Sequence, residues 1–308
     1  MASLRIWFKA TQPHSFLASL VGVALGTAIA WTRTGRFDAV ALVLTALGVV
    51  CLHAGTNMSN DSIDFKRGVD NLPPHLVSPF TGGARVLPDG AVSFEAHRRV
   101  WMGFFAAAAV IGLVLAATRP NGWILVVLGA IGGAIGVFYT LPPFALQYHG
   151  VGEIAVAAIF GPLVVLGSCV VQTGAVSLEP MWASIPLGLL VAAFLLVNEM
   201  PEHETDPRGG KCTIPARIGL ERSVRLYQAM VFAALLLIVV LAVLQLVPWP
   251  SLLGLIAIVP LTKARSVLRA HFREYPAHIR ANAATIQAVL LLGAGMTAGY
   301  ILARAANL

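Results

Sequence analysis

Two polar segments follow apolar runs and repeat the same order of residue types. The first, NMSNDSIDFKRGVD, spans residues 57–70, and the second, NEMPEHETDPRGGK, spans residues 198–211. Each opens with an asparagine, places an acid four residues later and continues with further acids and cations. Mg²⁺ prefers oxygen ligands, takes one or two carboxylates and completes its coordination with water and substrate phosphate. The repeated pattern therefore predicts a Mg²⁺ site that receives a phosphorylated substrate.

The acids and asparagines of each segment share one side of a helix. The predicted metal ligands are Asn57, Asp61, Asp64, Asn198, Glu202 and Asp206. In the first segment they stand at i, i+4 and i+7, so a continued helix turns the two acids about 40° or less from the asparagine. In the second they stand at i, i+4 and i+8, and Pro201 is expected to bend that helix. Both acidic faces are expected at one mouth of the molecule, where a cation offsets their mutual repulsion.

Cations follow each acidic group. The predicted phosphate-binding residues among them are Lys66, Arg67, Arg208 and Lys211. Lysine and arginine both bind phosphate, but membrane topology also requires them at cytoplasmic helix ends. The sequence leaves both interpretations open for these four residues.

The elements that carry these segments are membrane-spanning helices. Hydrophobic residues make up 57% of the 308 positions, charged residues make up 11%, and the mean hydropathy is +0.80, which is far from soluble composition. Apolar runs long enough to span a bilayer lie near 16–32, 38–56, 100–118, 123–141, 153–171, 181–198, 226–246, 249–262 and 284–303. We therefore expect an all-α polytopic membrane protein with nine transmembrane helices. It forms one domain, 1–308, with repeat-related halves of about 1–145 and 146–308.

Charge distribution orients the predicted spans. Seventeen of the 21 lysines and arginines lie on the side of the N-terminus, which places that side in the cytoplasm. The basic excess is thus an orientation signal and does not indicate nucleic acid as a partner. Of the fourteen acids, only Asp38 and Glu179 lie on the outer side. Nearly all the others fall in the long cytoplasmic segments 57–99 and 199–225, which predicts a cytoplasmic active site.

Three further features bear on the site. His53 lies one turn before Asn57 within a span, where an ionisable residue is a functional candidate, and it is predicted to line an acceptor pocket. Gly82-Gly83 and Pro73-Pro74 are typical of turns that fold the long loop back as a cap. The three cysteines show no spacing that indicates a disulfide or a zinc site.

A phosphorylated substrate and an apolar protein together favour prenyl diphosphate chemistry. Ionisation of an allylic diphosphate needs the charge of the leaving group to be stabilised, which metal ions and cations do. The carbocation that forms must be kept from water, and an intramembrane cavity excludes water.

The residues also resemble those of the UbiA superfamily of intramembrane prenyltransferases. The similarity rests on WFKATQPHSF near the start, the two acidic segments, FYTLPPFALQYHGVGE at 138–153 and SPFTGGARVLPDG at 78–90, the last typical of the menaquinone-pathway branch. The resemblance implies a nine-helix ring around a central cavity, a lateral opening to lipid, and two Mg²⁺ ions that bridge the diphosphate at the cytoplasmic mouth. The turn residues of the long loop add cytoplasmic cap loops to this expected fold.

Residue roles follow from that resemblance. It implies diphosphate contacts for Lys66, Arg67 and Lys211, and it places Tyr139 near the reacting carbon, where an aromatic face stabilises a cation. A tyrosine that anchors a membrane interface is the alternative for Tyr139. The chain departs from the pattern at Glu202, Gln12 and His149, where related sequences usually carry Asp, Arg and Arg. The predicted catalytic residues are Asp61, Asp64, Glu202, Asp206 and Tyr139, and Asn60 joins His53 and the four cations as predicted substrate-binding residues.

The predicted reaction transfers a polyprenyl group from a polyprenyl diphosphate to an aromatic acceptor, with Mg²⁺ as cofactor. The favoured acceptor is 1,4-dihydroxy-2-naphthoate, and the alternatives are 4-hydroxybenzoate, homogentisate or a glycerol phosphate lipid. A transporter of divalent cations or phosphorylated lipids is the alternative from another class. A transport pathway would be expected to place a carboxylate at mid-span, and the sequence has none there.

Overall fold

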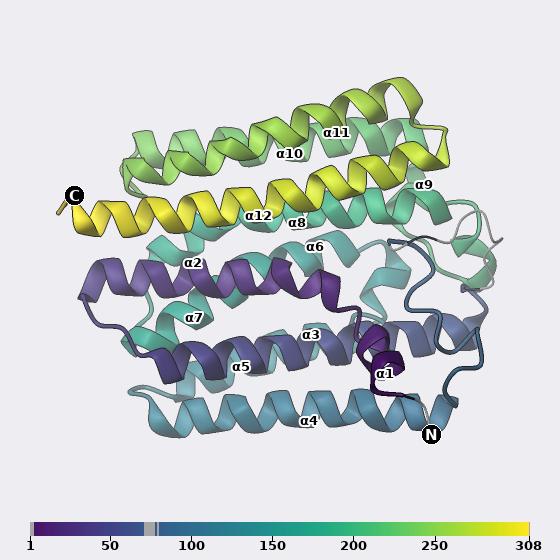
Figure 1. Cartoon of the computed structure of the whole chain (residues 1–308), viewed down its shortest axis with the longest axis horizontal. Helices are drawn as coiled ribbons and strands as arrows, with labels where there is room; N and C mark the ends of the chain where they lie inside the picture. The colour runs from purple at the N-terminus through teal and green to yellow at the C-terminus, as the bar shows by residue number, and fades with distance from the viewer. Residues whose placement is uncertain (1–2, 71–77, 79, 308) are drawn as a thin grey trace.

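The computed structural model describes residues 3–70, 78 and 80–307, and these residues are mainly helical with no strand among them. The long helices lie side by side along the horizontal axis of Figure 1. Their bounds are α1 Leu4–Ala10, α2 Phe16–Thr34, α3 Ala39–Arg67, α4 Phe94–Thr118, α5 Trp123–Phe138, α6 Gly152–Ala158, α7 Val164–Thr173, α8 Leu178–Glu199, α9 Ile214–Ile218, α10 Leu220–Val243, α11 Ile258–His271 and α12 Tyr275–Ala305.

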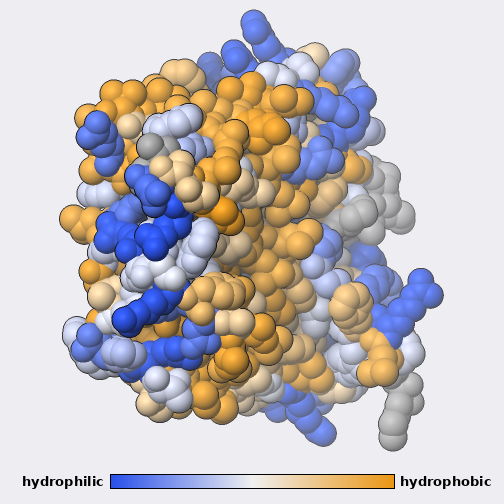
Figure 2. Space-filling view, turned by 60° about the vertical axis from the view of Figure 1, so that its left-hand side comes forward, coloured by the Kyte–Doolittle hydropathy of each residue, from blue (hydrophilic) through white to orange (hydrophobic). Residues whose placement is uncertain are grey.

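The helices confirm an integral membrane protein. Within the described part of the chain, eight helical segments are long and apolar enough to cross a membrane, and the shorter apolar α5 is a ninth candidate. Four of these segments are composite. Helices α6 and α7 join through a π-helical turn at Ile159–Leu163, and 3-10 helices precede α2 at Pro13–Ser15, follow α8 at Met200–Glu202 and precede α11 at Trp249–Ala257. Figure 2 shows apolar side chains over the middle of the molecule and hydrophilic side chains gathered toward its two ends. The nine predicted spans therefore correspond to nine apolar helical segments.

Successive helices pack into a closed circuit. Helix α2 contacts α3 and α12, α3 packs on α4, and α4 packs on α5, which contacts α7. Helix α6 packs on α8, α8 on α10, and α11 on α12. The circuit brings the C-terminal ends of α3 and α8 to the end of the bundle that also holds α1 and α9, at the right of Figure 1. The two acidic segments therefore meet in space.

The two acidic segments have different backbones. Helix α3 continues through most of the first segment and ends at Arg67, and the capping Gly68 has a φ of 72°, in the left-handed region. Helix α8 ends at Glu199, and the chain then forms 3-10 turns at Met200–Glu202 and Asp206–Gly209. Pro201 has no N–H to donate to the preceding turn, so the helix predicted to bend ends there instead.

Candidate active site

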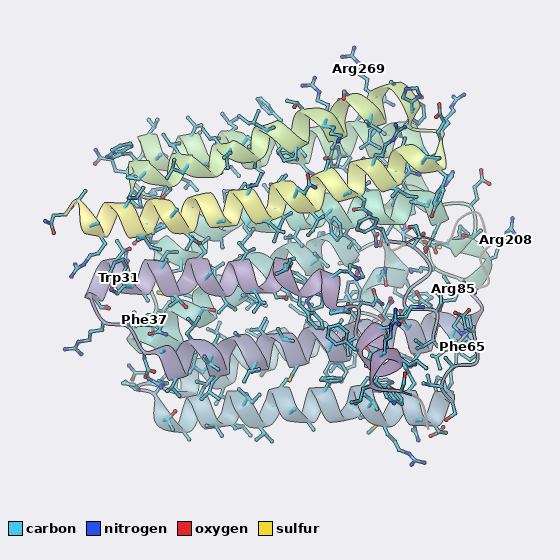
Figure 3. The ribbon with its side chains drawn as sticks, viewed as in Figure 1. Trp31, Phe37, Phe65, Arg85, Arg208 and Arg269 are labelled. Carbon is cyan, nitrogen blue, oxygen red and sulfur yellow. The ribbon has the colours of Figure 1, made fainter. Side chains whose placement is uncertain are left out.

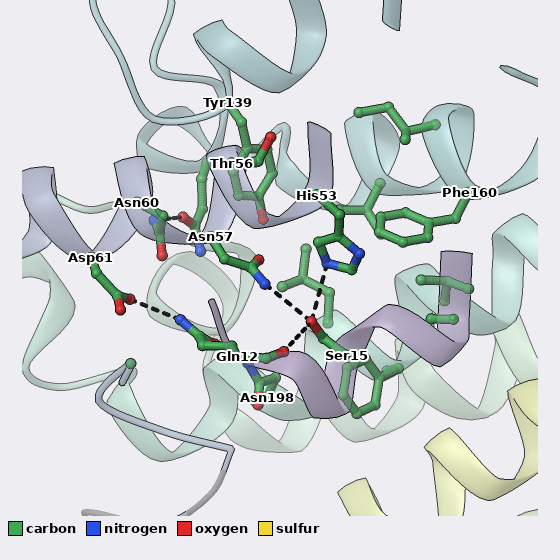
Figure 4. A pocket seen from close by; sticks show the side chains of 18 of the residues that line it. Gln12, Ser15, His53, Thr56, Asn57, Asn60, Asp61, Tyr139, Phe160 and Asn198 are labelled. Atoms are coloured by element: carbon green, nitrogen blue, oxygen red, sulfur yellow. Dashed lines mark hydrogen bonds between the residues drawn. The ribbon is translucent and has the colours of Figure 1, made fainter. Parts of the chain in front are cut away.

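A cavity of about 220 Å³ lies among α2, α3, α6 and α8 (Figure 4). Its polar end is lined by Asn57, Asn60, Asp61, Asp64, Asp70, Asn198, Glu202 and Lys211. The cavity is apolar farther in. Its lining there comes from earlier turns of α3 and α8, from α6 and from the π-helical turn. This part is lined by Val49, Leu52, Val156, Ile159, Phe160, Val191, Phe194 and Leu195. One cavity therefore joins a carboxylate-rich mouth to an apolar chamber within the spans.

Backbone amides of the segment after Phe80 hold two of the carboxylates. Gly82 donates its N–H to Glu202 Oε1 at 2.8 Å, and Ala84 donates its N–H to Asp61 Oδ2 at 3.1 Å. A Cβ atom on Gly83 would lie 2.4 Å from Asp61 Oδ1, and the φ of Gly83 is +61°, so only glycine fits there without strain. The predicted cap is present at Gly82-Gly83, whereas Pro73-Pro74 lies outside the described residues.

A buried ion pair joins the two acidic segments. Lys211 Nζ lies 3.0 Å from Asp64 Oδ2, and both side chains are at most 6% exposed. Tyr148 donates its hydroxyl to the other Asp64 oxygen at 2.6 Å. Burial acts to lower the pKa of Lys211, but the carboxylates of Asp64, Asp206 and Glu202 outweigh it and hold this pKa well above its usual value. Lys211 is therefore a fixed positive charge.

Burial disfavours the ionised form of two further acids. Asp206 is fully buried, accepts from Thr213 Oγ1 at 3.3 Å, and has no partner for Oδ1 within the described part of the chain. Burial raises the pKa of Asp206 to about 7, although the Lys211 ammonium opposes the rise. Burial and the carboxylates of Asp64 and Asp61 raise the pKa of Asp70 to about 9. Additional positive charge would stabilise the ionised form of both acids.

These residues fit Mg²⁺. The donors at the mouth are carboxylate and amide oxygens. Asp206 does not line the cavity, but its buried Oδ1 has no partner among the described residues. Among the described residues, no three His, Cys, Asp or Glu side chains converge closely enough to hold an ion alone. Mg²⁺ does not require such a cage, since it keeps several positions for water and substrate phosphate.

The four predicted phosphate-binding cations do not lie together. Of these, Lys211 lines the cavity and the other three do not. Lys66 lies over the Phe94 ring at 4.3 Å, and Arg67 lies over the Tyr148 ring at 4.1 Å. Arg208 is exposed and points away from the molecule in Figure 3.

The predicted catalytic residue Tyr139 and the remaining predicted substrate-binding residues, Asn60 and His53, line the cavity. Tyr139 lines it just beyond α5. Asn60 donates to Thr140 Oγ1 at 3.1 Å and to Gln147 Oε1 at 2.8 Å. His53 is placed by α2, because its Nδ1 lies 2.7 Å from Ser19 Oγ and its Nε2 lies 3.3 Å from Ser15 Oγ.

Three lining residues did not emerge from the sequence. Glu199 is 4% exposed and lies at the end of a span, where a buried acid is a functional candidate. Gln147 donates to Glu199 Oε1 at 3.3 Å and links it to Asn60. Gln12, noted in the sequence only as a departure, donates to Asp61 Oδ1 at 2.9 Å. A polar residue next to a motif asparagine was the available signal for Glu199, and for Gln147 the signal was its place in the family-like segment 138–153.

Comparisons with known proteins identify the family and the fold. The model of the UbiA prenyltransferase family matches residues 19–286. The chain is 25% identical over 252 residues to a 2-carboxy-1,4-naphthoquinone phytyltransferase of a Synechocystis strain, covering 82% of this chain and 78% of the relative. It is 29% identical over 225 residues to the 1,4-dihydroxy-2-naphthoate octaprenyltransferase of Bacillus subtilis, covering 73% and 70%. A UbiA homolog from Archaeoglobus fulgidus, solved with GPP and Mg²⁺, has the same fold, with a TM-score of 0.65, 15% identity, and coverage of 94% and 99%.

Proposed function

This chain belongs to the UbiA prenyltransferase family, and we propose that it transfers a polyprenyl group from a polyprenyl diphosphate to an aromatic acceptor in a Mg²⁺-dependent reaction. The observation that carries the proposal is the single cavity that joins the buried acids of both segments to an apolar chamber. The acids suit a metal-bound diphosphate, and the chamber suits the hydrocarbon chain. The excess of cations on the N-terminal side supports a cytoplasmic position for the acidic end.

The diphosphate is held at the acidic end. Asp61, Asp64, Glu202 and Asp206 would hold Mg²⁺, with Asn57 and Asn198 beside them. When bound, Mg²⁺ neutralises charge on the diphosphate leaving group. Lys211 adds a buried positive charge at the same end. Lys66, Arg67 and Arg208 attract the anionic substrate to the mouth from outside the cavity, as exposed cations do through long-range fields.

The chemical step forms a carbon–carbon bond. The bond between the allylic carbon and oxygen breaks, and its electron pair leaves with the diphosphate. The apolar lining excludes water from the allylic cation, and the Tyr139 ring stabilises that cation through its π face. The electron-rich ring carbon of the acceptor attacks, and with a naphthoate acceptor the carboxylate then leaves as CO₂.

The proposed acceptor is 1,4-dihydroxy-2-naphthoate. The names of two relatives, which specify naphthoate or naphthoquinone substrates, support this choice. Within the cavity, His53 and the hydroxyl groups of Ser15 and Ser19 form a polar patch on α2 and α3 that suits the oxygen atoms of an aromatic acceptor. The edges and faces of Phe16 and Phe160 lie against the His53 ring, with centroids 5.5 and 5.1 Å away.

Product analysis tests the proposal. Purified protein in detergent receives Mg²⁺, prenyl diphosphates of several lengths and a mixture of naphthoate, 4-hydroxybenzoate, homogentisate and glycerol phosphate acceptors. Mass spectrometry is expected to detect a prenylated, decarboxylated naphthalene product that disappears when EDTA replaces Mg²⁺. A product on another acceptor alone would overturn the choice of acceptor. No prenylated product with any acceptor would overturn the proposed function.

A further inference from the structure

The two motif asparagines turn opposite ends of their amide groups to their neighbours. Asn57 Nδ2 donates to the backbone carbonyl of Thr11 at 3.3 Å and to Ser15 Oγ at 3.0 Å, as the dashed line to Ser15 in Figure 4 shows. A backbone carbonyl only accepts hydrogen bonds, so the nitrogen must face it. Asn57 Oδ1 has no hydrogen-bond donor within the described part of the chain and remains available as an oxygen ligand.

Asn198 is held the other way round. Its Oδ1 accepts a hydrogen bond from Asn282 Nδ2 at 2.8 Å. Asn282 lies on α12 and is 1% exposed, so this contact is inside the bundle. The Asn198 side chain also lines the cavity, and its Nδ2 donates to no described residue. The amide therefore points its NH₂ group toward the space that receives the substrate.

The reverse orientation of this pair is less favourable. If Asn198 donated to Asn282, the NH₂ group of Asn282, with two donors, would be left in the buried position. In the observed orientation the group without a partner there is the Asn282 oxygen. Unpaired buried donors are rarer and costlier in proteins than an under-satisfied carbonyl oxygen.

We propose that Asn282 is a positioning residue that turns the Asn198 amide nitrogen toward the cavity, so that Asn198 donates a hydrogen bond to the diphosphate and does not ligate Mg²⁺. The sequence pattern had made Asn198 a metal ligand equivalent to Asn57. An amide NH₂ is a hydrogen-bond donor, whereas Mg²⁺ takes oxygen. A hydrogen bond from Asn198 to a charged phosphate oxygen is of the strong class. The assignment deepens the proposed function and rests on it.

Asn198→Asp is the direct test. Aspartate keeps an oxygen to accept from Asn282 and replaces the NH₂ group with an oxygen that repels the diphosphate. The measurement is the Kd of an unreactive prenyl thiolodiphosphate, by calorimetry in detergent, across a Mg²⁺ titration. We expect the Kd of the analogue to rise about tenfold or more with no fall in the Mg²⁺ concentration needed for half-maximal binding. An unchanged Kd would overturn the assignment. A lower Mg²⁺ requirement would also overturn it and would indicate that residue 198 ligates the metal.

Asn282→Asp tests the positioning step without changing Asn198. An aspartate at 282 only accepts, so the Asn198 NH₂ group turns to it and the Asn198 oxygen turns to the cavity. The Kd of the analogue is again expected to rise, and Asn282→Gln, which retains a donor, is expected to recover part of the affinity. If both variants bind the analogue as the wild type does, Asn282 has no positioning role.

A matched control removes another buried hydrogen bond from the same helix. Tyr227 bonds to Thr285 Oγ1 on α12 at 2.8 Å, and Tyr227→Phe deletes that bond without touching Asn282. It is expected to lower the thermal unfolding midpoint and to leave the Kd of the analogue unchanged. An equal loss of affinity in this control would mean that the Kd rises in the Asn282 variants because the protein is less stable, and not because Asn198 has turned. Turnover of prenyl diphosphate by the wild type distinguishes these outcomes from failure of the proposed function. If the wild type turns over prenyl diphosphate and the Asn198 and Asn282 variants bind the analogue with an unchanged Kd, only the roles assigned to Asn198 and Asn282 fail.

Discussion

The first acidic segment lies on one continuous helix, whereas the second runs past the end of its helix into short turns. Asn57, Asp61 and Asp64 stand on one continuous helix, α3. After α8 ends, Glu202 and Asp206 are placed by short 3-10 turns. A similar order of residues is therefore carried by two different backbone structures, a helix in the first segment and short turns in the second. The segment without a helix needs outside partners, namely the Gly82 amide, Thr213 and the Lys211–Asp64 ion pair.

Neutralising one acid in each segment is the largest expected perturbation. Asp61→Asn and Asp206→Asn are each expected to lower Mg²⁺-dependent turnover about a hundredfold or more, since each removes charge that a metal-bound leaving group requires. The readouts are product formation at saturating Mg²⁺ and elution of folded protein by size exclusion. Near-normal turnover in both variants would refute a site built from the two segments.

The same pair of variants sharpens the comparison through stability. Asp61 accepts from Gln12 and Ala84, so the amide of an asparagine opposes one of these two donors. Asp206 Oδ1 has no such donor among the described residues. In EDTA, Asp61→Asn is therefore expected to unfold at a lower temperature than Asp206→Asn. The reverse order would mean that the first segment is the less constrained one.

Breaking the ion pair between the segments has the next largest effect. Lys211→Met leaves Asp64 buried among other carboxylates without its cation, and loss of one partner of a buried pair costs about 3–5 kcal/mol. We expect a lower unfolding midpoint in detergent and little turnover. Lys263→Met, at an exposed position on α11, is the control and is expected to unfold like the wild type. Equal midpoints for the two variants would show that the Lys211–Asp64 contact does not support the second segment.

The sequence predicted the helices better than it predicted the tertiary contacts that hold the acidic residues in place. Nine apolar segments follow directly from hydropathy, and the face shared by Asn57, Asp61 and Asp64 follows from helical spacing because α3 does continue. Periodicity is informative only while a helix lasts. Past Pro201 the positions of Glu202 and Asp206 depend on which distant groups meet them, and spacing carries no record of those contacts.

The absence of tertiary contacts from the sequence pattern also explains why the positions of the cations, and the role of residues such as Gln147, were not predicted. Composition places Lys66, Arg67, Arg208 and Lys211 at one end of the bundle, but only the tertiary structure separates the buried Lys211 from the exposed three. Gln147, in the 3-10 helix Leu146–His149 and far in sequence from both acidic segments, is likewise placed beside Asn60 by tertiary folding.

The cap tests how far the second segment relies on its partners. Gly83→Ala places a Cβ atom 2.4 Å from Asp61 Oδ1, so the cap must shift and the Gly82 amide moves from Glu202. We expect kcat/KM for the prenyl diphosphate to fall about tenfold, the order that loss of one charged hydrogen bond produces. Gly90→Ala is a matched control, since its φ of +67° carries similar backbone strain with no atom within 4 Å of the added Cβ. If both alanines reduce kcat/KM equally, the loss comes from backbone strain and not from displaced carboxylates.

Removing the helix break is the mildest change and the most specific one. Pro201→Ala restores an N–H that can extend α8 by a further residue and turn Glu202 away from Gly82. We expect a several-fold rise in KM for the prenyl diphosphate and an unfolding midpoint close to that of the wild type. Pro186→Ala changes a proline of the same helix that does not line the cavity, and it is expected to leave this KM unchanged. A Pro201→Ala enzyme with wild-type KM would show that the contacts at Gly82 and Lys211 place the second segment even when its helix is allowed to continue.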